Sequence, residues 1–322
     1  MTPTAVVTGC AGFVGSHLSE RLVAEGFRVL GVDAFTAYYP REDKEANLAG
    51  LAREPRFELL ELDLSQAPLE PVLAGAARVF HLAAQPGVRG SFGEGFADYV
   101  RDNVLATQRL FEAALAVGAG RVVWASSSSV YGDAPAYPCR ENETLPSPRS
   151  PYGVTKHTCE DLAGVYRARG LDAVGLRYFT VYGPRQRPDM AMRRLCESLL
   201  DRTPFPLYGD GSQSRDFTYV ADVVDATFLA SLAPRPAPIY NVGGGEEASL
   251  ATVIAELEAL AGRPAFLDVH DVQVGDVRRT GADTSLARRT LGWQPVTKLN
   301  DGLRSEFEWV AARHRRAIAA AA

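Results

Sequence analysis

Short apolar runs alternate with longer amphipathic segments through the first half of the chain. Strands are expected at residues 5–7, 28–33, 57–62, 78–82, 121–125 and 173–178. Helices are expected between them, up to about residue 25 and over 42–52, 97–117 and 151–169. Because strands and helices alternate, we predict an α/β fold with a doubly wound parallel (Rossmann) sheet.

The second half has shorter and less regular segments. Two strands at 217–220 and 239–242 enclose a helix at 221–233, and helices at 249–261 and 300–315 flank an extended segment at 265–269. Residues 184–206 carry five Arg and four Pro and receive no element. We predict a large lobe over 1–180, with returning segments at about 217–242, and a smaller mixed α/β lobe over 181–322. A ligand cleft should lie between them, at the carboxyl ends of the strands.

Three glycines, Gly9, Gly12 and Gly15, follow the first apolar run at a spacing of three. Strand, glycine turn and helix in this order let a backbone approach a pyrophosphate at a helix N-terminus. Asp33 ends the second strand, and no Arg follows it directly. An acid at this position suits the ribose hydroxyls and repels a 2′-phosphate, so the pattern favours NAD over NADP. The alternative is a purely structural glycine turn.

Composition excludes several classes of function. The net charge is −5 without a block of like charges, which gives no electrostatic support for binding nucleic acid or a membrane surface. Four widely spaced cysteines form no CxxC pair, and the five histidines show no ligand spacing with them. We therefore expect no metal and no disulfide framework, and a reducing, cytoplasmic location. No apolar run reaches the length of a membrane span.

Tyr152 and Lys156 share one face of the helix expected over 151–169. The Lys ammonium and a positively charged nicotinamide ring would favour the phenolate form of the Tyr, which makes the pair a candidate acid/base. Residues 126–129, four serines, follow the fifth strand where hydroxyls would face the ligand crevice. The alternatives are an exposed helix pair and a polar loop.

Taken together, these segments resemble the extended short-chain dehydrogenase/reductases, the family of nucleotide-sugar epimerases and dehydratases. The resemblance extends to residues 291–293 and rests on the following segments: 8–15, Asp63-Leu64, 81–84, Asn103, 130–132, Tyr152 with Lys156, and 215–220. It implies NAD as cofactor, a UDP-sugar substrate and a homodimer formed through the helices near 97–117 and 151–169.

Within the family, residues 35–39, 85–89 and 177–191 resemble those of the UDP-glucuronate 4-epimerases. The implied reaction is inversion at C4 through a 4-keto intermediate. UDP-galactose 4-epimerases carry Asn at the position of Thr180, and dehydratases and decarboxylases carry carboxylates where this chain has Ser128 and Ser129. The alternatives are a UDP-glucose/UDP-galactose 4-epimerase, a UDP-glucuronate decarboxylase, or an NAD-sensing binding protein of the same fold.

The expected site residues fall into three groups. Catalytic roles are expected for Ser127, Tyr152 and Lys156. Cofactor contacts are expected from Gly9, Gly12, Phe13, Val14, Gly15, Asp33, Phe35, Lys44, Asp63, Leu64, Leu82, Ala83, Ala84, Gln85, Asn103, Ser126, Tyr152, Lys156 and Tyr178. Substrate contacts are expected from Arg89, Ser127, Ser128, Ser129, Tyr152, Thr180, Arg185, Met190, Tyr208, Arg215 and Asp276.

These substrate contacts rest on different arguments. Ser128, Ser129 and Thr180 offer three neutral hydroxyl donors that could hold a sugar carboxylate. Arg89 and Arg185 are candidates on charge alone, and surface ion pairs are the alternative for both.

Overall fold

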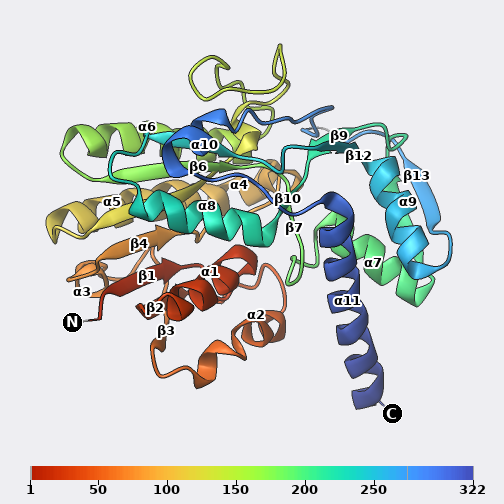
Figure 1. Cartoon of the computed structure of the whole chain (residues 1–322), viewed down its shortest axis with the longest axis horizontal. Coiled ribbons are helices and arrows are strands. Elements are labelled where there is room, and N and C mark those ends of the chain that lie inside the picture. The colour runs from red at the N-terminus through yellow and green to blue at the C-terminus, as the bar shows by residue number, and fades with distance from the viewer. Residues whose placement is uncertain (1, 274, 322) are drawn as a thin grey trace.

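A seven-stranded, wholly parallel sheet forms the centre of the molecule (Figure 1). The computed structural model describes residues 2–273 and 275–321. The strand order is β11-β6-β5-β4-β1-β2-β3. The strands are β1 (Thr4–Thr8), β2 (Arg28–Asp33), β3 (Phe57–Glu61), β4 (Arg78–His81), β5 (Arg121–Ser127), β6 (Ala173–Tyr178) and β11 (Ile239–Val242).

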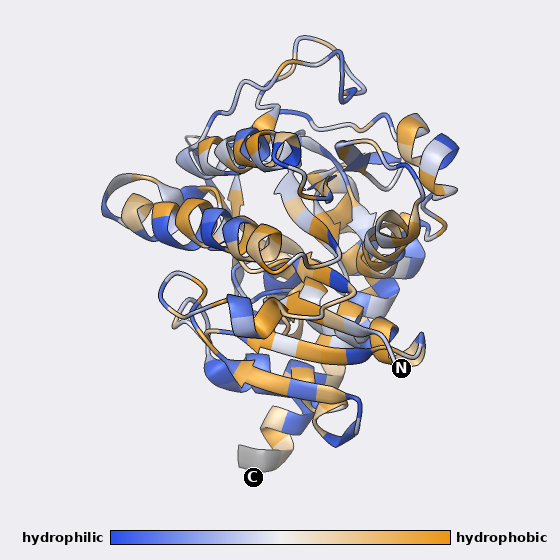
Figure 2. Ribbon diagram, turned by 90° about the vertical axis from the view of Figure 1, so that its left-hand side faces the viewer, coloured by the Kyte–Doolittle hydropathy of each residue, from blue (hydrophilic) through white to orange (hydrophobic). Residues whose placement is uncertain are grey.

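Both faces of the sheet are covered by helices. In β1, Ala5 and Val7 pack toward one helix layer, while Val6 between them packs toward the other. The first layer contains α1 (Phe13–Ala24), α8 (Val220–Leu232) and α10 (Ser285–Leu291); the second contains α3 (Glu70–Leu73), α5 (Ala106–Ala116) and α6 (Pro151–Ala168). Apolar residues therefore dominate the strands, whereas the helices are two-sided (Figure 2). The predicted doubly wound fold is confirmed.

The strand order reverses direction at β1, which lies between β2 and β4. The chain builds β2 and β3 on one side of β1, and β4, β5 and β6 on the other. Loops that leave the carboxyl ends of β1 and β4 therefore diverge, and a crevice opens between them. This topology places the glycine turn after β1 opposite the loop after β4.

A smaller lobe is built around three helices, α7 (Ala191–Asp201), α9 (Leu250–Ala261) and α11 (Leu299–Ala321). Their apolar faces meet at Leu195, Leu257 and Leu303. Paired with these helices are three two-stranded ladders: β7 (Val181–Tyr182) with β10 (Thr218–Tyr219), β8 (Pro204–Tyr208) with β13 (Phe266–His270), and β9 (Ser214–Asp216) with β12 (Glu247–Ser249). Between these segments, the chain returns to the large sheet as β11.

Several elements differ from the pattern-based expectation. The helix expected over 97–117 is α4 (Phe96–Tyr99), a π-helical turn (Val100–Leu105) and α5. The helix expected over 42–52 ends earlier, as α2 (Arg41–Leu48), followed by a 3-10 turn (Leu51–Arg53). Helix α7 was not predicted, because its apolar stripe lies among the Arg and Pro residues of 184–206. Further 3-10 turns cover Arg89–Ser91, Gly93–Gly95 and Ser128–Val130.

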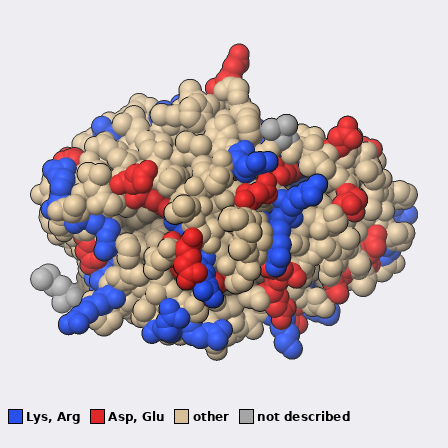
Figure 3. Space-filling view, turned by 90° about the horizontal axis from the view of Figure 1, so that it is seen from above, with Lys and Arg blue, Asp and Glu red and all other residues tan. Residues whose placement is uncertain are grey.

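The face of the molecule drawn in Figure 3 shows no dominant charge. On the face drawn in Figure 3, Lys and Arg side chains are interspersed with Asp and Glu. Within residues 2–273 and 275–321, no helix is both long and apolar enough to cross a membrane.

A fully buried carboxyl group, Glu306 of α11, lies against the turn after β7. Its Oε2 accepts a hydrogen bond from the backbone N–H of Gly183 at 2.8 Å, while Oε1 has no hydrogen-bond partner among the described residues. Burial raises the pKa of Glu306 to about 8, against the opposing effects of the Gly183 hydrogen bond and the Arg193 charge. The folded protein therefore holds a proton that the unfolded chain releases near pH 4.5.

This raised pKa predicts a specific pH dependence of stability. Glu306 contributes stability that is fully present below the unfolded pKa and is lost as pH rises through about 8. Glu306→Gln keeps a carbonyl oxygen for Gly183 and never ionises. From pH 5 to pH 8.5, the free energy of unfolding of the variant should therefore increase by about 1–3 kcal/mol relative to that of the wild type. Urea unfolding at both pH values measures this difference. Glu308→Gln, at an exposed position of the same helix, should show no such trend.

Candidate active site

The turn after β1 is shaped by two glycines that no other residue could replace. Gly9 has a φ of +70°, and a Cβ there would lie 2.8 Å from the backbone N of Ala83. A Cβ on Gly15 would lie 2.0 Å from the carbonyl oxygen of Gly9. Because neither position carries a side chain, the turn can pack against both the loop after β4 and the first turn of α1. Helix α1 begins after Gly12 without a side-chain cap, so its first N–H groups remain available to an anion.

Asp33, at the end of β2, organises the residues around this turn. Its Oδ2 accepts from the N–H of Ala11 at 3.1 Å, and its Oδ1 accepts from the N–H of Phe35 at 2.9 Å. Lys44 of α2 places Nζ 3.7 Å from the same Oδ1. On the other side of the turn, Asn47 of α2 donates to the carbonyl of Ala11 at 3.0 Å. The end of β2 and helix α2 therefore hold the glycine turn in one position.

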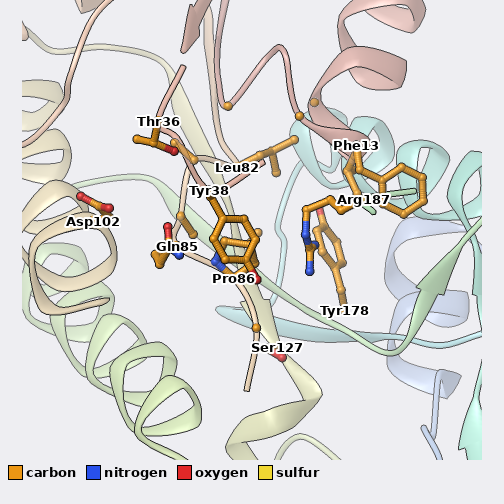
Figure 4. A pocket seen from close by; sticks show the side chains of 18 of the residues that line it. Phe13, Thr36, Tyr38, Leu82, Gln85, Pro86, Asp102, Ser127, Tyr178 and Arg187 are labelled. Carbon is orange, nitrogen blue, oxygen red and sulfur yellow. The ribbon is translucent and has the colours of Figure 1, made fainter. Parts of the chain in front are cut away.

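A cavity of about 450 Å³ is lined by this turn, by the loop after β4 and by residues at the ends of β5 and β6. Figure 4 shows some of the side chains that line it. Most of the expected site residues line it. They are Gly9, Gly12, Phe13, Val14, Gly15, Asp33, Lys44, Asp63, Leu64, Leu82, Ala83, Ala84, Gln85, Ser126, Ser127, Ser128, Ser129, Tyr152, Lys156, Tyr178, Thr180 and Met190. The structure thus brings together the glycine turn, the serines and the Tyr–Lys pair from distant parts of the chain.

Tyr152 and Lys156 enter the cavity from the first turns of α6. The helix starts sharply, with Pro151 in its first turn and the Ser150 hydroxyl accepting from the N–H of Gly153 at 3.1 Å. Lys156 is almost completely buried, and its Nζ donates to the carbonyl oxygen of Ala125 at 2.9 Å. This bond fixes the ammonium group beside the end of β5, where the serines begin.

The aromatic ring of Tyr152 is held by a neighbouring tyrosine. Tyr99 lies edge-on to it, with ring centroids 6.1 Å apart. The Tyr99 hydroxyl donates to the carbonyl of Pro86 at 2.7 Å, which links this ring to the loop after β4. Tyr152 therefore has a defined ring position in the cavity.

The two serines that end β5, Ser126 and Ser127, have different partners. The Ser127 hydroxyl accepts from the N–H of Ser129 at 3.1 Å and caps the short turn that carries Ser128 and Ser129. Ser126 points the other way, and its hydroxyl donates to Glu160 of α6 at 2.6 Å. Both serines line the cavity, but Ser126 also anchors β5 to α6.

Two expected cofactor contacts support the cavity without lining it. Asn103 accepts from the N–H of Gln85 at 2.7 Å and donates to the Thr155 hydroxyl at 3.0 Å, which ties the loop after β4 to α6. Phe35, with a φ of +47°, is buried in the apolar layer beside the turn. In the same region, burial lowers the pKa of His81 to about 3, and its ring nitrogens contact Thr8 and Thr107. His81 is therefore a structural, neutral imidazole.

A second cavity of about 180 Å³ adjoins the first. The two share Val88, Ser128, Ser129 and Thr180, and the smaller one adds Arg215 and Asp276. Burial lowers the pKa of the Arg215 guanidinium, an effect that the charge of Asp276 opposes. The two cavities therefore adjoin, and hydroxyl groups lie on the wall that they share.

Arg89 and Tyr208, both expected to contact substrate, lie beside the smaller cavity. Arg89 forms an ion pair with Asp276 at 2.8 Å, and its guanidinium lies over the Tyr208 ring at 4.1 Å. This contact joins the segment after β4 to the smaller lobe. Neither side chain is part of either cavity lining.

Arg185 is placed elsewhere. Its guanidinium forms an ion pair with Glu20 of α1 at 2.6 Å and approaches the Ser16 hydroxyl at 3.3 Å. It lines neither cavity. Because its guanidinium is paired with Glu20 of α1, we assign Arg185 to packing between the lobes and not to binding of a sugar or diphosphate.

Arg187 and Tyr38 are among the lining residues that the sequence did not single out as site residues. Arg187 reaches the cavity beside Tyr178, and its guanidinium lies over the Tyr38 ring, 6.0 Å from the ring centroid (Figure 4). Asp189 links them, since it pairs with Arg187 at 3.0 Å and accepts from the Tyr38 hydroxyl at 3.1 Å. Both residues lie in segments that carry the family resemblance, and this was the evidence from which they could have been predicted. Because residues 184–206 contain five Arg, however, the sequence gave no reason to select Arg187.

Comparison with known proteins bears on this site. Residues 5–243 match the model of the NAD dependent epimerase/dehydratase family. An uncharacterized UDP-glucose epimerase of Bacillus subtilis is 43% identical over 315 residues, covering 96% of this chain and 98% of that protein. A UDP-glucuronate 4-epimerase of Thermodesulfobacterium geofontis is 37% identical over 310 residues, covering 94% and 95%.

Among solved structures, the UDP-glucuronic acid 4-epimerase of Bacillus cereus, in complex with UDP-glucuronic acid and NAD, is 38% identical to this chain. It superposes with a TM-score of 0.93 and covers 96% of this chain and 99% of the other. The similarity therefore extends over nearly the whole length of both chains.

Proposed function

Because the chain belongs to the NAD-dependent epimerase/dehydratase family, we propose that it is an isomerase that converts UDP-glucuronate to UDP-galacturonate by inversion at C4. One observation carries the proposal. The glycine turn, the Tyr152–Lys156 pair and the hydroxyls of Ser128, Ser129 and Thr180 all line one continuous space. A cofactor site, an acid/base and a neutral clamp for a carboxylate therefore meet in it.

The residues around the glycine turn fit NAD. Gly12 lines the cavity, and a Cβ there would meet only the Gly9 carbonyl, at 3.1 Å, so the backbone is open to close approach by a phosphate. The free N–H groups of α1 favour the pyrophosphate. Asp33 offers a carboxylate where a ribose 2′-hydroxyl would bind and a 2′-phosphate would be repelled. When bound, NAD would accept a hydride from the sugar and return it.

Tyr152 and Lys156 supply the proton chemistry. We assign to the Tyr152 phenolate the removal of the proton from the sugar 4-hydroxyl and its return at the end of the cycle. Lys156, held by the Ala125 carbonyl, places a positive charge that stabilises the phenolate. In the same cavity, the Ser127 hydroxyl can accept a hydrogen bond from the substrate hydroxyl or donate one to it.

The hydroxyl clamp distinguishes epimerisation from elimination and decarboxylation. A 4-keto uronate is a β-keto acid and loses CO₂ when its carboxylate stands perpendicular to the carbonyl plane. Ser128, Ser129 and Thr180 can hold that carboxylate in another orientation without protonating carbon. The acidic residues in the larger cavity lining are Asp33 at the end of β2, Asp63 after β3 and Asp102 of the π-helical turn. The carboxylate that lines the smaller cavity with the serines, Asp276, is paired with Arg89 and is therefore not placed as a free acid/base for C5–C6 elimination.

UDP-glucose/UDP-galactose epimerisation is the second candidate. The 43% identical relative is described as a UDP-glucose epimerase, and nothing in the hydroxyl trio rejects a neutral hydroxymethyl group by charge. An NAD-sensing binding protein is disfavoured, since such a protein does not need both Tyr152 and Lys156 in the cavity.

We also infer a homodimer formed through α5 and α6. Val154 and Val165 of α6 expose 46% and 58% of their surface, and Leu105, just before α5, is also exposed.

We further infer a cytoplasmic location. All four cysteines are free and buried, as suits a reducing compartment. Recovery of the protein outside the cytoplasmic fraction of its cells would contradict this location.

The first prediction concerns the reaction itself. Wild-type protein should convert UDP-glucuronate to UDP-galacturonate, followed by chromatography or NMR, and faster than it converts UDP-glucose. Tyr152→Phe keeps the ring packed on Tyr99 but removes the acid/base, so turnover should fall by about 10²–10⁴-fold. Tyr166→Phe, farther along α6, should retain activity. Preferential conversion of UDP-glucose would select the second candidate, and an active Tyr152→Phe would remove Tyr152 from the mechanism.

A second prediction tests the hydroxyl clamp. Ser128→Ala and Thr180→Ala should each lower kcat/KM for UDP-glucuronate. The loss should correspond to about 1–3 kcal/mol of transition-state stabilisation, the cost of a lost charge-assisted hydrogen bond. Each should also release some CO₂ and a UDP-pentose, because the carboxylate is held less firmly. Thr252→Ala, at an exposed position in α9, serves as the control. Wild-type kinetics without CO₂ in both variants would make the clamp wrong.

A third prediction concerns assembly. Light scattering at micromolar concentration should give the mass of a dimer, and Val165→Glu should give a monomer because it places a charge in the apolar interface. Val296→Glu, at a 75% exposed position after α10, should leave the dimer intact. A monomeric wild-type protein would contradict the assembly.

A further inference from the structure

Helix α2 contacts the glycine turn with one side and the smaller lobe with the other. On the first side, Lys44 lines the cavity beside Asp33, with its Nζ also donating to the Thr36 carbonyl at 3.0 Å. Asn47 holds the carbonyl of Ala11 in the turn itself. The helix therefore forms part of the wall of the proposed dinucleotide site, next to the end of β2 (Figure 1).

On its other side, α2 is tied to two helices of the smaller lobe through Asp43. Its Oδ2 accepts from Arg193 of α7 at 2.9 Å, and its Oδ1 accepts from Arg313 of α11. Both guanidinium groups also lie over the ring of Trp309, at 5.5 and 5.2 Å from its centroid. One carboxylate thus joins two helices that are distant from α2 in the sequence.

The contact is buried and its donors are satisfied. The Asp43 and Arg193 side chains are only 13% and 8% exposed. Arg193 directs Nε to Glu197 at 2.8 Å and a second nitrogen to the carbonyl of Gln186 at 3.0 Å, which leaves the third for Asp43. Because water is largely excluded, loss of the Asp43 charge would leave a guanidinium nitrogen without its partner at considerable cost.

The loop before α2 makes a second contact across the cavity. Tyr38, whose ring lines the cavity, donates to Asp189 in the segment before α7. Residues 36–44 therefore form a wall that is fastened to the smaller lobe at both ends, by Tyr38 and by Asp43. A dinucleotide covered by this wall can leave only when the wall moves away from the smaller lobe.

We propose that Asp43 is a positioning residue that holds α2 closed over the bound dinucleotide and thereby slows the release of NAD. The inference rests on the NAD site of the proposed function. Asp43 does not line the cavity; it acts through α2, which carries Lys44 and Asn47. The epimerisation cycle regenerates NAD, so slow release keeps the enzyme ready for the next turnover.

The test is the rate at which NAD leaves the protein. NAD retained after gel filtration is quantified by chromatography of the denatured protein, and its release is followed by trapping free NAD with an excess of a dehydrogenase that forms fluorescent NADH. Asp43→Asn preserves the shape but not the charge, and should speed release by at least about tenfold. Glu45→Gln removes an equal charge from the exposed face of the same helix and should change release less than about twofold.

A second variant keeps the test independent of folding in Asp43→Asn. Arg313 is 33% exposed, so Arg313→Gln leaves the buried Arg193 pair intact and should speed release by a smaller factor. Arg316→Gln, at an exposed position three residues later, is its control. In the Asp43→Asn/Arg313→Gln double variant the effects should not add, because both changes break the same contact.

The possible outcomes are distinct. If wild-type protein retains NAD and Asp43→Asn releases it no faster than Glu45→Gln, the positioning role is overturned while the NAD site stands. If release in Asp43→Asn is no faster than global unfolding followed by circular dichroism, the effect is general destabilisation and the role is again overturned. Wild-type protein that binds no NAD would overturn both the inference and the proposed function.

Discussion

Close backbone packing at the turn after β1 is the constraint on which the rest of the site depends. A side chain at Gly9 or Gly15 would collide with the backbone of Ala83 or with the Gly9 carbonyl. Because neither has one, α1 can start directly at the turn and the loop after β4 can lie against it. The helix N-terminus and the carboxyl end of the sheet consequently face the same space. Asp33 and Asn47 then fix the turn by hydrogen bonds to Ala11.

The other lobe completes the space that this turn begins. Thr180, Arg187 and Met190 reach the larger cavity from the segment between β6 and α7, whereas Arg215 and Asp276 line the adjoining cavity from the smaller lobe. The contacts between the lobes include two ion pairs, Asp43 with Arg193 and Arg89 with Asp276. Polar interdomain contacts of this kind are compatible with opening and closing, as ligand exchange requires.

The arrangement of charges in the site suits a reaction that must spare its substrate's carboxylate. The positive charges include Lys156 and Arg187 in the larger cavity, and Arg215 in the smaller one. Between them lie neutral hydroxyls, from Ser128, Ser129 and Thr180. Hydroxyl donors can bind an anion without repelling it and without offering an acid strong enough to protonate carbon. The neutrality of the groups on this shared wall therefore suits the chemistry of the site as well as its shape.

Much of the fold and most of the site could be predicted from the sequence by itself. The alternating apolar runs determined the parallel sheet, because strands buried on both faces must be apolar throughout. The glycine spacing, Asp33, the four serines and the Tyr152–Lys156 pair predicted residues that line the larger cavity, because each is a local pattern at the end of a strand or the start of a helix.

Only the tertiary structure decided which arginines face the cavity. Arg185 and Arg187 are two residues apart, yet a positive φ at Arg185 and the acid Glu20 turn one toward α1, while Asp189 and Tyr38 hold the other in the cavity wall. Helix α7 was hidden for the same reason, since its Arg193 is buried by partners on α2 and in its own lobe. A long charged side chain takes its position from the partners that surround it, and those partners lie far away in the sequence.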